Sequence, residues 1–173
     1  QKQTQVTEPG ANQAMVFAKM ARLASDALQR PEDAIEYWGE VLRIRGENRE
    51  ALGALELLYT ATESWRDLVD VLERQVSLVE GNTQRELEIY EKLGQIWGDE
   101  LDREEKSIDN WKKVLELAPD QLTAKWALIE LYERSDRFED FVTMGTELID
   151  TLEVGGIKEQ ELARKLARVA TDE

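Results

Sequence analysis

One spacing constrains the fold of this 173-residue chain more than any other feature, because apolar and aromatic residues recur after 73 positions. Trp38 is followed by Trp111 at this distance, and Tyr59 by Tyr132. The register continues without a gap and begins a third copy. Further pairs are Ile35 with Ile108, Leu42 with Leu115, Ala51 with Ala124, Leu55 with Leu128, and Leu93 with Leu166. Such self-similarity identifies a repeat protein, in which neighbouring units bury a shared core.

Each 73-residue unit contains two helical hairpins. The equivalent positions Met20, Leu55, Leu93 and Leu128 are separated by 35, 38 and 35 residues. We therefore expect the first and third hairpins to carry one extra residue before their second helices. Apolar residues at 3.6-residue spacing predict helices throughout, so the chain is expected to be an all-α solenoid of antiparallel hairpins.

The helix signals predict the boundaries of the repeats. The first helix is expected at about 12–28, with an apolar stripe formed by Val16, Met20, Leu23, Ala24 and Ala27. Pro31 is expected to begin the second helix, and Gly46 to cap it in a left-handed conformation. Ser64 with Asp67 predicts a capping box.

We predict a tail or the end of a preceding repeat at 1–11 and hairpins at 12–48, 49–82, 83–120 and 121–156. The first helix of a truncated fifth repeat is expected at 157–173. The chain begins with Gln1 rather than Met, and its last predicted helix is unpaired, so we expect it to be a fragment of a larger repeat protein.

Charge and missing residue types limit the possible functions. The chain has 37 acidic and 22 basic residues, a net charge of −15, and neither cysteine nor histidine. Thiol nucleophiles, zinc–thiolate sites and histidine bases are excluded, and no phosphate-binding glycine loop occurs. The negative charge disfavours nucleic acid, and no apolar run is long enough for a membrane span. We expect a non-enzyme without cofactor or metal, soluble, with the cytoplasm slightly favoured over the periplasm.

Two stretches resemble the tetratricopeptide repeat (TPR) family. Tyr90-Glu-Lys-Leu-Gly-Gln-Ile-Trp97 is similar to the first-helix pattern, and Ser107-Ile-Asp-Asn-Trp-Lys-Lys-Val-Leu-Glu-Leu-Ala-Pro119 to the second. The second and fourth hairpins depart from the family pattern. There Glu56 and Ile129 replace the glycine, and Leu68 and Phe141 fill the small second-helix position. The resemblance implies a right-handed superhelix whose first helices line a concave groove.

The resemblance also implies that this groove binds an extended peptide or a helix of a partner. By position it would present Lys19, Arg22, Lys92, Gln95, Trp126, Glu130 and Arg134. The family's basic clamp for a C-terminal carboxylate is incomplete here. Trp126 stands two residues before Leu128, off the main stripe, where its repeat partner is Gly53. It is either an exposed binding anchor or a side chain packed on the neighbouring hairpin.

Three functions remain open from the sequence. The first is a non-catalytic scaffold that binds a protein or peptide, for which a basic partner would suit the acidic chain. The second is a structural spacer within a larger repeat array. The third is weak homodimerisation through residues 158–170, where Leu162, Leu166 and Val169 form an apolar stripe on the terminal helix.

Overall fold

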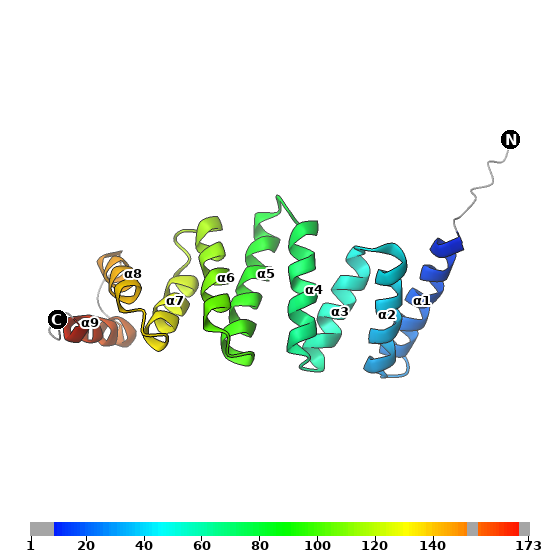
Figure 1. The fold of residues 1–173 in the computed structure, drawn as a ribbon, viewed down its shortest axis with the longest axis horizontal. Helices are drawn as coiled ribbons and strands as arrows, with labels where there is room; N and C mark the ends of the chain where they lie inside the picture. The colour runs from blue at the N-terminus through cyan, green and yellow to red at the C-terminus, as the bar shows by residue number, and fades with distance from the viewer. Residues whose placement is uncertain (1–8, 152–155, 170–173) are drawn as a thin grey trace. The chain divides into compact units, whose positions relative to one another are not determined.

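The computed structural model describes residues 9–151 and 156–169, so the predicted tail at 1–11 lies mostly outside the described residues. The described residues form nine α-helices and one π-helical turn, with no strand, and 84% of the structure is helical. The all-α prediction is confirmed. In chain order (Figure 1) the elements are α1 (Pro9–Asp26), α2 (Pro31–Arg45), α3 (Arg49–Ala61), α4 (Trp65–Leu78), α5 (Thr83–Gln95), η1 (Ile96–Glu100), α6 (Glu104–Leu117), α7 (Leu122–Arg134), α8 (Phe138–Thr151) and α9 (Ile157–Val169).

The chain divides into two compact units, which we call unit 1 (Gln1–Asn82) and unit 2 (Thr83–Glu173). In unit 1, α1 packs on α2, α2 on α3, and α3 on α4. In unit 2, α5 packs on α6, α6 on α7, α7 on α8, and α8 on α9. Consecutive helices joined by short turns are therefore neighbours, as expected for stacked antiparallel hairpins.

The turns inside the hairpins repeat the 73-residue register in their backbone geometry. Each turn places one non-glycine residue at positive φ: Gln29 (51°), Glu63 (53°), Asp102 (52°) and Asp136 (55°). Gln29 lies nine positions after Met20, whereas Glu63 lies eight positions after Leu55. The predicted extra residue of the odd hairpins is therefore present. It is accommodated before the turn, where the Leu101 amide bonds five residues back to Ile96, ending η1.

Two predicted helix-end features are corrected by the structure. Gly46 follows α2 with φ 68° and ψ −135°, which is outside the left-handed helical region and accessible essentially to glycine alone. Its amide still bonds the Leu42 carbonyl. Ser64 precedes α4 but makes no capping hydrogen bond, because its hydroxyl pairs with the Thr62 hydroxyl at 2.9 Å. Pro31 does begin α2 as predicted.

The first helix differs from its prediction in both its ends and its buried face. It runs from Pro9 to Asp26 and buries Ala14, Ala21 and Ala24, with Phe17 and Ala18 partly buried in the core it shares with α2. Val16, Met20 and Leu23 of the predicted stripe are instead exposed. Periodicity detects an apolar face but does not say which of two apolar faces a neighbouring helix covers.

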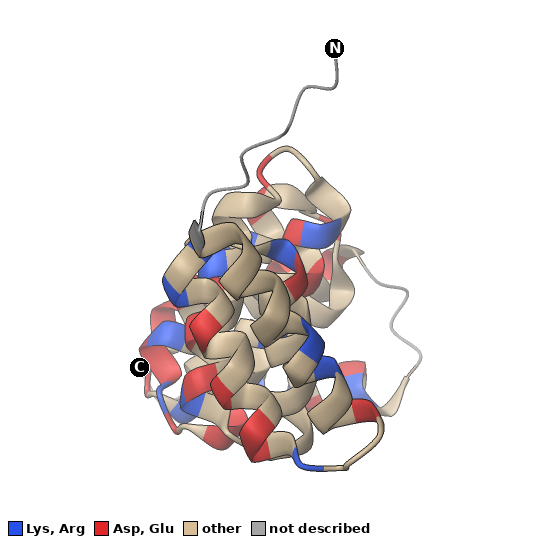
Figure 2. Cartoon of the chain, turned by 90° about the vertical axis from the view of Figure 1, so that its right-hand side faces the viewer, with Lys and Arg blue, Asp and Glu red and all other residues tan. Residues whose placement is uncertain are grey.

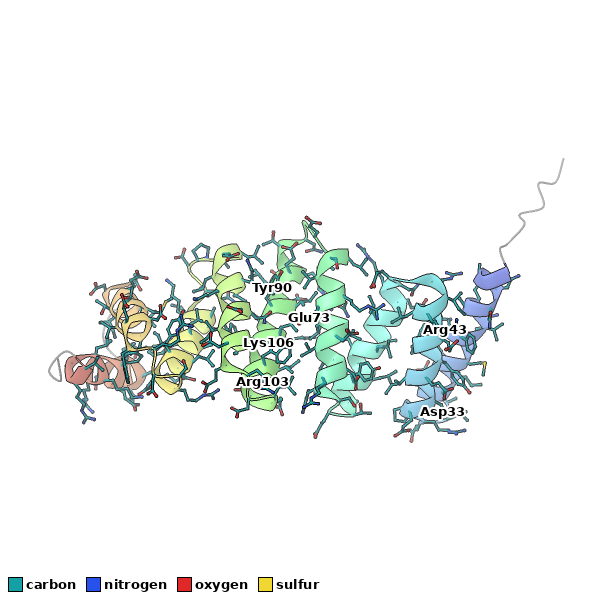
Figure 3. The ribbon with its side chains drawn as sticks, viewed as in Figure 1. Asp33, Arg43, Glu73, Tyr90, Arg103 and Lys106 are labelled. Atoms are coloured by element: carbon teal, nitrogen blue, oxygen red, sulfur yellow. The ribbon has the colours of Figure 1, made fainter. Side chains whose placement is uncertain are left out.

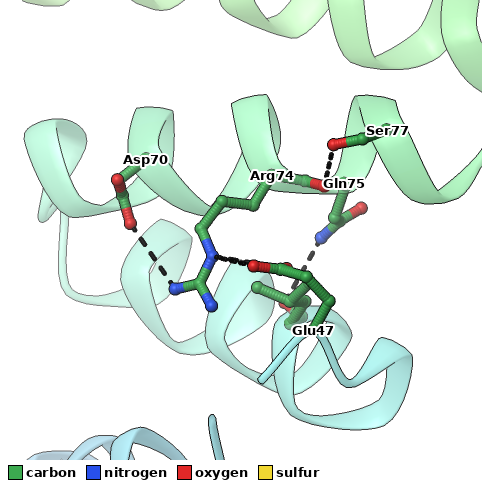
Figure 4. A network of polar contacts seen from close by, with 6 residues as sticks. Glu47, Asp70, Arg74, Gln75 and Ser77 are labelled. Carbon is green, nitrogen blue, oxygen red and sulfur yellow. Dashed lines mark hydrogen bonds and ion pairs between the residues drawn. The ribbon is translucent and has the colours of Figure 1, made fainter. Parts of the chain in front are cut away.

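A polar network joins the α2–α3 turn of unit 1 to α4 (Figure 4). Arg74 lies between Glu47, at 3.1 Å, and Asp70, at 3.8 Å. The buried Gln75 side chain donates to the Leu52 carbonyl at 3.3 Å and to the Glu56 carboxylate at 2.9 Å. Glu56 stands at the position where the TPR first-helix pattern has glycine. It is a buried carboxylate that accepts a hydrogen bond from Gln75.

In unit 2, Gly94 allows the helices α5 and α6 to pack closely. A Cβ on Gly94 would lie 2.7 Å from the ring of Trp111, so the glycine lets this buried ring approach α5. Beside it, the buried Ser107 hydroxyl donates to the Gly94 carbonyl at 2.6 Å. The Lys106 ammonium, labelled in Figure 3, lies 3.8 Å from the centroid of the partly buried Trp97 ring.

The stripe of α9 predicted for self-association is partly buried within unit 2. Leu162 is buried, and Leu166 and Val169 pack against the same core cluster. A Cβ on Gly145 of α8 would lie 3.1 Å from Leu166, so α8 and α9 are in close contact. Within the described part of 158–170, the stripe therefore contributes to the core of unit 2, with Leu166 and Val169 still partly exposed.

Candidate functional site

The candidate site lies in unit 2, around Trp126 on α7. A hollow of about 430 Å³ opens beside this side chain, and we call it the larger hollow. Four predicted groove residues line it together: Gln95, Trp126, Glu130 and Arg134. Its other lining residues are Gly94, Asp99, Ser107, Trp111, Leu122, Thr123, Ala127, Leu131 and Lys158. Residues from α5, η1, α6, α7 and α9 therefore converge on one site.

A smaller hollow of about 280 Å³ shares Trp126, Glu130 and Lys158 with the larger one. The Lys158 ammonium lies 5.8 Å from the centroid of the Trp126 ring, within the range of a cation–π contact. The indole is partly buried and packs against the core of unit 2. Trp126 therefore packs on the core of unit 2, as one of the two alternatives predicted, and it also lines both hollows.

Arg134 has a structural partner as well as a place in the larger hollow. Its Nε lies 2.8 Å from the Glu104 carboxylate at the start of α6. Its Nη2 donates to the Gly98 carbonyl at 3.3 Å, within η1. The guanidinium therefore links α7 to the turn between α5 and α6.

Several lining residues were missed from the sequence, of which Lys165 is the clearest. The 73-residue step that pairs Lys19 with Lys92 also leads to Lys165, so the register contained this signal. The Lys165 ammonium lies 2.7 Å from Glu133 and 4.0 Å from Glu161 in the smaller hollow. Its hydrogen bond to Glu133 raises the pKa of Lys165 above its ordinary value, partly opposed by burial. The lysine is therefore held as a cation.

The remaining predicted residues lie elsewhere. Lys19 and Arg22 line a separate hollow of about 260 Å³ in unit 1, where Arg22 Nε donates to the Glu50 carboxylate at 2.9 Å. Lys92 is exposed on α5 and lines none of these three hollows. The structure thus brings four of the seven predicted residues together and places two more side by side in the other unit.

The larger and smaller hollows are lined by charged groups of both signs. Carboxylates come from Asp99, Glu130, Glu133 and Glu161, and cations from Arg134, Lys158 and Lys165. Among the described residues, no group of three or more Asp or Glu side chains is placed to hold a metal ion. No described helix is both long enough and apolar enough to cross a lipid bilayer.

The comparisons with known proteins show the fold. No protein-family profile and no curated protein sequence matches the chain. Solved structures do match, and MamA is 20% identical, covers 91% of this chain and 82% of its own, and has a TM-score of 0.54. PilF of Pseudomonas aeruginosa is 15% identical, with coverages of 92% and 69% and a TM-score of 0.54. Both contain tetratricopeptide repeats, so the chain has the TPR solenoid fold that its motifs resemble.

Proposed function

We propose that this chain is a non-catalytic protein-interaction scaffold that binds an extended segment of a partner protein in the two hollows of unit 2. The observation that carries the proposal is the convergence of Gln95, Trp126, Glu130 and Arg134 on one hollow of about 430 Å³. An aromatic side chain with a few polar groups at a concave surface suits recognition of a peptide. Support for the non-catalytic role comes from the absence of cysteine and histidine in the sequence.

We propose further that the partner segment carries basic side chains. The chain has a net charge of −15, and Glu130, Glu133 and Glu161 line the smaller hollow together with the Trp126 indole. The ring already has the Lys158 ammonium above it, 5.8 Å from its centroid. A lysine or arginine side chain of a partner would pair with Glu130, the carboxylate that lines both hollows.

Selection from a random peptide display library on the intact chain tests this function. We expect the enriched peptides to contain Lys or Arg. Glu130→Lys should weaken their binding by about tenfold or more, because a cation replaces a carboxylate shared by both hollows. Glu147→Lys makes the same charge change at an exposed position of α8 that lines neither hollow, and should leave affinity unchanged.

A second variant addresses the polar wall of the larger hollow. Gln95 is exposed, so Gln95→Ala should weaken the enriched peptides without altering the circular dichroism spectrum. Peptides that bind wild type, Glu130→Lys and Gln95→Ala equally would contradict the proposed groove. Enrichment of acidic peptides alone would contradict the proposed charge of the partner.

A further inference from the structure

The smaller hollow of unit 2 has an apolar floor that a basic side chain of a partner would not use. Ile129, Phe141 and Leu162 line it and are 3%, 2% and 3% exposed, and the Trp126 ring belongs to the same lining. These residues come from α7, α8 and α9, so three consecutive helices of unit 2 build the floor. The volume of about 280 Å³ is below the usual range for pockets that hold whole small molecules, and it suits a single side chain.

The charged residues around this floor nearly cancel one another. Apart from Glu130, they are two carboxylates and two ammonium groups: Glu133, Glu161, Lys158 and Lys165. Lys165 lies 2.7 Å from Glu133 and 4.0 Å from Glu161, so this cation is already shared by two carboxylates. A charged side chain on the floor would lose water without gaining an unpaired opposite charge, whereas an apolar one is stabilised by leaving water. The smaller hollow therefore favours an apolar side chain.

The larger hollow offers the unpaired negative charge. Basic and acidic positions are interspersed over the helices (Figure 2), so the local balance depends on which charges already have partners. Glu130, which lines both hollows, and Asp99, which lines the larger one, are exposed and form no ion pair with a described residue. Arg134 is paired with Glu104, so among the described lining residues these two carboxylates outnumber the remaining cation, Lys158. The larger hollow therefore favours a basic side chain.

The two hollows are neighbours, because they share a wall formed by Trp126, Glu130 and Lys158. In an extended segment, adjacent side chains point to opposite faces, whereas side chains two positions apart point to the same side and are about 7 Å apart. A segment that crosses the shared wall can therefore place two alternate side chains in the two hollows.

We propose that the partner segment carries a leucine-sized apolar side chain two positions from a basic one. The apolar side chain enters the smaller hollow and contacts Ile129, Phe141 and Leu162. The basic side chain enters the larger hollow and pairs with Glu130. This inference rests on the proposed function, since it specifies which segments the two hollows of unit 2 recognise.

The probes are two capped pentapeptides of opposite order, Gly-Lys-Gly-Leu-Gly and Gly-Leu-Gly-Lys-Gly. At least one should bind the intact chain, and replacing its leucine by alanine should weaken binding by about tenfold or more, because buried apolar surface is lost. Methyl NMR shows where the leucine lies. It should give intermolecular NOEs to Ile129 and Leu162, which line only the smaller hollow, and none to Leu122 and Leu131, which line only the larger one.

A change of one methylene group in the floor provides a matched pair of variants. Ile129→Val should weaken the leucine peptide by roughly fourfold and leave the alanine peptide unchanged, because one methylene is removed from the contact. Ile108→Val makes the same change at a fully buried position of α6 that lines neither hollow, and should affect neither peptide. Circular dichroism checks that both variants are folded.

The results distinguish a failure of this inference from a failure of the proposed function. If the leucine and alanine peptides bind equally and both depend on Glu130, the groove stands and the apolar subsite is wrong. Leucine NOEs to Leu122 or Leu131 would overturn the assignment of the two hollows. Binding that is unchanged by both Glu130→Lys and Gln95→Ala would contradict the proposed function itself.

Two further results would overturn the inference. One is an absence of binding by either leucine peptide at millimolar concentration. The other is movement of the Ile129 and Leu162 signals on dilution without any peptide, which would show that a second copy of this chain fills the smaller hollow.

Discussion

Unit 2 contains hairpin three (α5 and α6) and hairpin four (α7 and α8). The two share a fold but place their large and small side chains on opposite helices. In hairpin three, Gly94 on the first helix opens space for Trp111 on the second. In hairpin four, Ile129 stands at the position of Gly94, and it is buried. The turn residues Asp102 and Asp136 are 34 positions apart, and the same step leads from Trp111 to Gly145. The large and small positions have therefore exchanged helices.

This exchange distinguishes hairpin four from hairpin three but is not repeated in unit 1, where the buried Leu72 stands 73 positions before Gly145. Gly145 does not receive a tryptophan but lies against Leu166 of α9, so the space freed on α8 is filled by the next helix. Hairpin four thus leaves room on its second helix for a side chain of α9. Because native cores are close-packed, a change at one of these positions must be matched on the helix that faces it.

The largest effect is expected from Trp111→Ala. The Trp111 ring is buried at 4% exposure against Gly94, so its removal should lower the free energy of unfolding by about 3–5 kcal/mol. Urea denaturation followed by circular dichroism measures this loss. Trp126→Ala is the control, and should cost clearly less because that ring is partly exposed. Equal losses would mean that Trp111 is not the centre of hairpin three.

Gly94→Ala should have the next largest effect. The added methyl would lie 2.7 Å from the Trp111 ring, and such overpacking costs about 1–3 kcal/mol even though alanine favours helix. In a Trp111→Leu background the same change should cost at least about 1 kcal/mol less, because the clash is gone. A double-mutant cycle measures this coupling. Additive effects would show that Gly94 is not needed to admit the ring.

Two other glycines should behave differently from Gly94. Gly53→Ala meets no atom within 4 Å and should raise the free energy of unfolding by about 0.5–1 kcal/mol, because alanine is the better helix former. Gly145→Ala should change it by less than about 1 kcal/mol, since the 3.1 Å contact is with the end of the Leu166 side chain. Thermal and urea unfolding of the two variants measure these changes. A Gly145→Ala loss as large as that of Gly94→Ala would break the distinction between the hairpins.

The smallest expected effect is on pH dependence in the even hairpins. Burial, aided by Asp67 and Asp70, raises the pKa of Tyr59, and burial with Asp140 raises that of its repeat partner Tyr132. A raised folded-state pKa contributes stability that is complete below the unfolded value of about 10 and is lost as pH rises through the folded value. Urea midpoints should therefore fall above pH 10. In the Tyr59→Phe and Tyr132→Phe double variant, the urea midpoint should fall less steeply with pH. An unchanged fall would show that other groups cause the pH dependence.

The site was predictable only in part. Position in the repeat was enough to group Gln95, Trp126, Glu130 and Arg134, because residues at equivalent turns of neighbouring first helices face the same side. The contacts of Arg134 with the Gly98 carbonyl and Glu104 could not be read from the sequence. They depend on η1, where one extra residue redirects the backbone carbonyls.

The sequence by itself determined the helical class, the 73-residue register and the extra residue in the odd hairpins, since each of these follows from local spacing. The tertiary structure decided which face of each helix is covered. It buried the alanines of α1 rather than Val16 and Leu23, and it packed Leu162 and Leu166 onto α8 instead of leaving them free. The physical reason is that periodicity records that a helix has an apolar face, whereas burial depends on whether a neighbouring helix lies against it.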